Sequence, residues 1–130
     1  MIAVDTNVLV RILVDDPGQP AQTSAARMLA SEAGEVYVPL IVMVETVWVL
    51  ESGYRLAKDA VVRVLEHLAV NQAFVLEAED LGHDALALYR SCNADYADCL
   101  ILSACRAKDL VTHTFDKRLA KLPGAQLVSA

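Results

Sequence analysis

Four acidic residues stand where a strand is expected to end, where a helix is expected to begin, or inside an apolar segment. They are Asp5, Glu45, Asp98 and Asp116. Clustered carboxylates suit phosphodiester cleavage, because Mg²⁺ and Mn²⁺ prefer hard oxygen ligands. Such an ion polarises the phosphoryl oxygen, lowers the pKa of the attacking water and neutralises the leaving oxygen. Together the four positions predict a divalent-cation site.

Glu45 is the most informative of these residues, because it is the only charged residue between Pro39 and Leu50. A helix that is apolar on every side is expected to be buried on most faces. An unpaired carboxylate there would be desolvated at a high cost or would take up a proton, so a metal ion or a basic partner is expected to compensate its charge. The alternatives are an ion pair with an arginine of the chain and a side chain that reaches solvent.

Each of the other acids also has a purely structural alternative. Asp5 follows an apolar run and could cap the next helix, a position that Asp favours. Asp95 and Asp98 lie three residues apart on the first turn of another helix, with Asp98 expected to point inward. There Asp95 could be the N-cap and Asp98 only a stabiliser of the helix dipole. Asp116 or Thr114 could cap a short helix.

Short apolar runs alternate with amphipathic stretches along the chain, which predicts strands alternating with helices. The expected strands are 2–4, 36–38, 73–76, 110–114 and 126–128, and the expected helices are 8–14, 19–33, 39–53, 56–70, 80–92, 96–107 and 117–122. This order predicts an α/β fold, a three-layer sandwich with a mainly parallel central sheet flanked by helices. Ligands gather at the carboxyl ends of the strands in such sheets, where Asp5 and Asp116 are expected.

Composition limits the alternatives further. The 130 residues predict a single domain over 1–130. A net charge of −6 argues against a protein that merely coats nucleic acid, whereas a site built from carboxylates is necessarily acidic. No apolar run is long enough for a membrane helix, and the three cysteines have no C-x-x-C spacing. We therefore expect a cytoplasmic protein that is not bound to a membrane.

Four segments resemble the acidic motifs of PIN domains, in the family's order and over nearly the whole chain. They are Ile2–Val10, Val44–Leu50, Ala94–Leu102 and Thr112–Lys117. The most specific is the start Asp5-Thr6-Asn7 followed by an apolar helix. The similarity is closest to VapC-type toxins, small PIN proteins that cleave RNA and are held inactive by a VapB antitoxin.

This resemblance implies a metal-dependent endoribonuclease that uses Mg²⁺ or Mn²⁺. By it, Asp5, Glu45 and Asp98 would be the core metal ligands, and Asp116 would complete the site directly or through water. Asp95 resembles an additional acid of one subgroup. Polar positions that could orient ligands or water are matched by Thr6, Asn7 and Thr114. The resemblance also implies a homodimer and a VapB-like antitoxin, whose arginine could enter the acidic pocket.

Two other functions fit parts of the sequence. A DNA-directed or structure-specific nuclease could use the same site on another substrate. A receiver-like signalling domain is also small, α/β and Mg²⁺-binding, but it needs an acidic pair after its first strand, where this chain has Asp5 followed by Thr6 and Asn7. A catalytically inactive PIN scaffold is opposed by the intact acids. No glycine-rich phosphate loop or Ser-His-Asp arrangement offers another chemistry.

Overall fold

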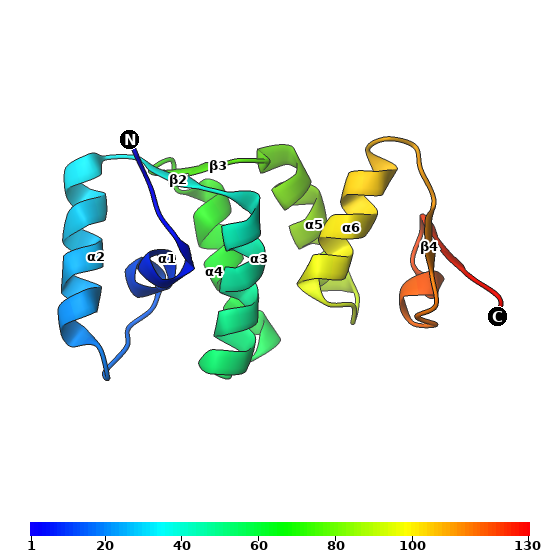
Figure 1. Ribbon diagram of the computed structural model, residues 1–130, viewed down its shortest axis with the longest axis horizontal. Helices are drawn as coiled ribbons and strands as arrows, with labels where there is room; N and C mark the ends of the chain where they lie inside the picture. Colours follow the sequence, from blue (N-terminus) through cyan, green and yellow to red (C-terminus); the bar gives the residue numbers. More distant parts are fainter. The chain divides into compact units, whose positions relative to one another are not determined.

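The computed structural model describes all 130 residues, and the chain folds into two compact units, Met1–Glu79 and Asp80–Ala130. Figure 1 shows the helices and strands of each unit in the order of the sequence. The two units differ in charge. The first contains eleven Asp and Glu against five Lys and Arg, and the second contains six of each, so the whole net charge of −6 belongs to Met1–Glu79.

The first unit is built on a parallel sheet of three strands in the order β1-β2-β3. These strands are β1 (Ile2–Ala3), β2 (Val36–Val38) and β3 (Phe74–Leu76). Ile2 lies opposite Val36, which lies opposite Phe74. Parallel neighbours need a crossover connection, and helices supply it here. The connections contain α1 (Thr6–Leu13), α2 (Pro20–Ala33), α3 (Leu40–Trp48), the π-helical turn η1 (Val49–Gly53) and α4 (Lys58–Val70).

The core of this unit comes from the apolar face of each helix and from the middle strand. Its most deeply buried side chains are Leu9, Val10, Val36, Val38, Val47, Leu50, Val61 and Leu68. Burying one such side chain completely contributes about 1.5–3 kcal/mol. This packing holds α1 against both α2 and α3, which places the start of α1 beside the middle of α3.

The second unit contains two helices and a parallel pair of strands. These are α5 (Glu79–Ser91, whose first residue ends the first unit), α6 (Tyr96–Arg106), β4 (Thr112–Thr114) and β5 (Ala125–Leu127), with the 3₁₀ turn η2 (Leu119–Lys121) between the strands. Tyr89 of α5 meets Tyr96 of α6 edge to face, with ring centroids 5.6 Å apart. Buried residues of both helices complete the core, among them Leu86, Cys99 and Leu102.

The predicted α/β class with parallel strands is confirmed, and most elements lie within two residues of their predicted bounds. Two predictions differ in the kind of helix. The predicted helix 117–122 is the three-residue 3₁₀ turn η2, and the predicted helix 39–53 is α-helical only to Trp48 and ends in the π-helical turn η1. α2 ends at Gly34, whose φ of +79° is a conformation that glycine adopts without strain. None of the helices is long and apolar enough to cross a membrane.

Candidate functional site

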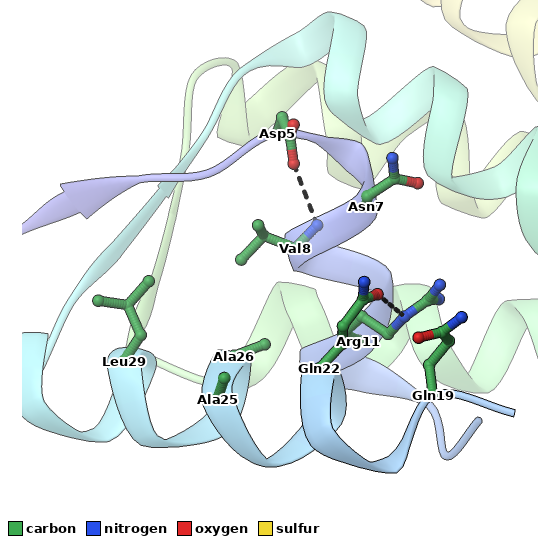
Figure 2. A pocket seen from close by; sticks show the side chains of 9 residues that line it. All are labelled: Asp5, Asn7, Val8, Arg11, Gln19, Gln22, Ala25, Ala26 and Leu29. Carbon is green, nitrogen blue, oxygen red and sulfur yellow. Dashed lines mark hydrogen bonds between the residues drawn. The ribbon is translucent and has the colours of Figure 1, made fainter. Parts of the chain in front are cut away.

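Asp5 follows β1 and occupies the N-cap of α1. Its Oδ1 accepts a hydrogen bond from the Val8 backbone N–H at 3.1 Å, as Figure 2 shows. Asp5 therefore caps the helix, as one of the two interpretations of the sequence predicted. This cap explains why α1 begins at Thr6, two residues earlier than predicted. The side chain is exposed and its Oδ2 has no protein partner. The cap thus uses one carboxylate oxygen and leaves the other available to a ligand.

Thr6 connects this turn to α3. Its Oγ1 donates a hydrogen bond to Glu45 Oε1 at 3.1 Å, across 39 residues of sequence. Asp5 and Glu45, two of the predicted ligands, are therefore attached to neighbouring elements through adjacent residues of α1. Thr6, which was predicted to orient ligands or water, thus contacts one of the predicted ligands. Asn7 is exposed on the first turn of α1, and Figure 2 shows its side chain projecting from that turn.

The expectation that Glu45 is buried is wrong, because its side chain is exposed. The buried face of α3 consists of Val42, Met43, Thr46 and Val47. Glu45 lies on the opposite face with Ile41 and Trp48, which are 65% and 67% exposed. The apolar residues of α3 exceed what one buried face can hold, so some of them reach the surface together with the carboxylate. Trp48 is accordingly not a core residue of its unit.

A cavity of about 520 Å³ opens beside Asp5, between α1 and α2. Figure 2 shows the polar side chains of Arg11, Gln19 and Gln22 close together, the apolar side chains of Ala25, Ala26 and Leu29 along α2, and Asp5, Asn7 and Val8 at the start of α1. The first helix of the unit thus carries the Asp5 carboxylate at the mouth of an open groove.

Arg11 has a structural role in this groove. It donates to the Tyr54 hydroxyl at 2.6 Å and to Gln22 at 3.1 Å, and it forms an ion pair with Asp16 at 3.3 Å. The Tyr54 hydroxyl in turn donates to Asp16 Oδ2 at 2.8 Å. This hydrogen bond is the largest cause that lowers the pKa of Asp16 below its ordinary 3.8. The network ties α1 to α2, to the loop between them and to the end of η1.

The second unit holds the other predicted acids. Asp98 is half-buried on the first turn of α6, in agreement with the sequence-based expectation that its side chain points inward. Burial, followed by the negative charges of Asp95 and Asp116, raises the pKa of the Asp98 carboxyl above its ordinary 3.8. The charges of Asp95 and Asp116 thus act on Asp98, although 18 residues separate Asp98 from Asp116, and these three residues are called the acidic cluster below.

The two acids whose charges act on Asp98 differ in their hydrogen bonds to the backbone. Asp95 takes the N-cap position of α6, but its side chain makes no capping hydrogen bond. Asp116 Oδ1 accepts from the backbone N–H groups of Arg118 and Leu119 at 2.8 and 3.3 Å. Thr114 Oγ1 accepts from the Asp116 backbone N–H at 3.0 Å. The Asp116 side chain thus stabilises the turn that leads into η2, whose N-cap is Arg118, and Thr114 holds the backbone at Asp116.

The acidic residues have the chemistry that a divalent cation requires. Within each unit taken by itself, no group of three or more His, Cys, Asp or Glu side chains lies close enough together to hold a metal ion. The donor set nevertheless has the right chemistry, because it consists of carboxylate oxygens, the ligands of Mg²⁺ and Mn²⁺. The like-charge crowding around Asp98 is also the condition that a bound cation would relieve. The donors therefore fit such an ion chemically.

Two features of the second unit were not predicted from the sequence. The Cys92 and Cys99 sulfurs are 3.7 Å apart, although the cysteines lack any C-x-x-C spacing that would have indicated a contact. Lys121 shares a cavity with Arg118 and Asn93. The only sequence signal for that pair of cations is their spacing of three residues, which places them on the same side of a short turn.

Comparison with known proteins identifies the family. The family model of the PIN domain matches residues 2–125. A VapC ribonuclease of Aquifex aeolicus (strain VF5) is 28% identical over 101 residues, which cover 77% of this chain and 75% of that protein. The residues matched by the family model include all five acids discussed above.

Proposed function

Since the chain belongs to the PIN-domain family, we propose that it is a metal-dependent endoribonuclease, the toxin of a VapBC-type pair. The similarity to a VapC ribonuclease supports the choice of RNA over DNA as substrate. The observation that carries the proposal is the acidic cluster of the second unit, in which burial and like charges raise the pKa of Asp98. Carboxylates whose pKa is raised by burial and like charges are typical of sites that bind a ligand of opposite charge.

We assign the core metal-binding role to Asp5, Glu45 and Asp98, and a completing role to Asp116. Asp95 adds a fifth carboxylate whose side chain is not used for capping. Thr6 orients Glu45 through its hydroxyl, and Thr114 orients the backbone at Asp116. Asn7 is assigned to ligand or water orientation at the start of α1. These assignments treat residues 1–130 as a single nuclease domain.

The chemistry follows from these oxygens. A bound Mg²⁺ or Mn²⁺ supplies Lewis-acid polarisation of the phosphoryl group. The carboxylates provide a region of negative charge that holds the cation, and the hydroxyls keep their carboxylate partners in fixed directions. We propose the cytoplasm as the place of this activity, because its RNA substrate is found there.

Charge supports a basic protein partner. The net charge of −6 is confined to Met1–Glu79, which also contains the groove beside Asp5. A VapB-like antitoxin could place an arginine among the carboxylates, where its guanidinium would compensate their charge in place of a cation. The exposed apolar residues Ile41 and Trp48 suit contact with a second copy of the chain, in a homodimer.

The first test is dependence on a divalent ion. Protein purified without antitoxin should cleave RNA in Mg²⁺ or Mn²⁺ and stop in excess EDTA, with activity restored when the ion is added back. A panel of single-stranded RNA, duplex RNA and DNA of the same sequences separates a ribonuclease from a DNA-directed nuclease. Undiminished cleavage in excess chelator would contradict the proposal.

A further inference from the structure

The second unit has a cavity of about 590 Å³ between the link from α5 to α6 and the η2 turn. Its polar lining includes Asn93, Arg118 and Lys121, and no carboxylate takes part in it. The Arg118 and Lys121 side chains make no ion pair or hydrogen bond, in contrast to Arg11, Arg27 and Arg63, each of which has an aspartate partner. Two positively charged side chains, Arg118 and Lys121, therefore line the same cavity without a protein partner, in a protein whose net charge is negative.

Both walls of this cavity continue directly into the acidic cluster. On one wall Ala94 precedes Asp95, and on the other Arg118 donates its backbone N–H to Asp116. The Asn93 amide also has no protein partner and adds N–H donors to the first wall. The cavity thus offers cationic and neutral donors next to the carboxylates that we assign to catalysis.

We infer that this cavity binds a phosphate of the RNA strand, next to the phosphate that is cleaved. The inference rests on the proposed ribonuclease function and names residues that position its substrate. Guanidinium and ammonium groups bind phosphate oxygens as charge-assisted donors, and Arg118 has the planar geometry that suits two of them. Because these contacts reach the backbone and not the bases, they strengthen binding to RNA of any sequence.

The test measures how binding depends on salt. Binding of a fluorescent single-stranded RNA is followed by anisotropy in EDTA, over a range of salt concentrations, for the wild type and for Arg118→Gln/Lys121→Gln. Removing one cationic partner of a single-strand phosphate lowers the slope of log K against log salt by roughly 0.7, so the double variant should lower it by roughly 1.4. Removal of two charged hydrogen bonds should also weaken binding at least about tenfold. In cleavage assays KM should rise with kcat little changed.

Two control proteins make the result specific. Arg63→Gln/Lys108→Gln removes the same charge outside the cavity and should keep the wild-type slope. Arg118→Lys/Lys121→Arg keeps both charges and should restore most of the slope, which separates phosphate contact from damage to the η2 turn. Equal slopes for the two glutamine variants would overturn the inference while RNA cleavage by the wild type leaves the proposed function standing. A wild type that neither binds nor cleaves RNA would overturn both.

Discussion

At the level of single residues, burial and two neighbouring carboxylates raise the pKa of Asp98 above its ordinary 3.8 in the folded protein. Asp98→Asn should lower cleavage by about 100-fold or more, as expected when a charge that acts on the transition state is removed. The same variant should raise the Tm of the metal-free protein at pH 7. A carboxyl with a raised pKa binds its proton more tightly when folded, so its penalty is absent below pH 3.8 and develops as the pH rises through the raised pKa.

Thermal unfolding in EDTA at pH 7 and pH 3, together with RNA cleavage, checks both effects. The gain in Tm should vanish at pH 3, where Asp98 is protonated in the wild type. Asp84→Asn is the matched control, since it removes an exposed acid in the middle of α5, outside the cluster, and should change neither property. Wild-type cleavage by Asp98→Asn would remove this residue from the proposed ligands.

Thr6 acts through Glu45. Thr6→Val keeps the size and branching of the side chain but removes the hydroxyl that donates to Glu45 Oε1. We expect kcat to fall about tenfold, since residues that orient metal ligands typically contribute factors of about 10–100. Thr6→Ser should retain most of the activity, because it keeps the donor. The positioning role would be refuted by valine and serine variants with the same kcat.

At the level of elements, the first unit depends on the network that joins α1, α2 and η1 through Arg11, Asp16 and Tyr54. Tyr54→Phe removes the hydroxyl at its centre and should lower the free energy of unfolding by about 1 kcal/mol. The pKa of Asp16 is lowered in the folded protein, so the ionised form contributes stability above pH 3.8, and this contribution is lost as the pH falls below 3.8 through the folded pKa.

Urea denaturation of Tyr54→Phe, Asp16→Asn and the combined variant measures the coupling between the two side chains. The coupling should be present at pH 7 and should decrease as the pH falls below 3.8. Strictly additive single effects at pH 7 would show that the hydrogen bond contributes nothing to stability.

At the level of the whole molecule, the concentration of negative charge in Met1–Glu79 predicts an inhibitory complex with a basic partner. Co-expression with the product of the neighbouring reading frame should yield a complex that does not cleave RNA, and alanine in place of the partner's arginine should weaken inhibition. Light scattering should give a dimer for the protein alone. A monomer that does not bind the neighbouring product would refute the complex and leave the nuclease proposal intact.

The sequence alone was enough to predict the alternation of strands and helices, the parallel α/β class and the family. Hydrophobic periodicity, the Gly34 stop and the Asp5 start signal are local properties, and the acidic motifs are contiguous residues. Tertiary structure alone decided which face of α3 is buried. An almost entirely apolar helix has no pattern that marks one face, so only packing against its neighbours could place Glu45 at the surface.

Packing also decided the contacts between distant segments. Thr6 meets Glu45 across 39 residues, the charges of Asp95 and Asp116 act on Asp98, and Tyr54 joins Arg11 to Asp16. Arg118 and Lys121 face a cavity with Asn93 and have no carboxylate partner there. None of these follows from local sequence, because a side-chain contact depends on how whole elements pack, whereas the conformation of each element depends mainly on its own residues.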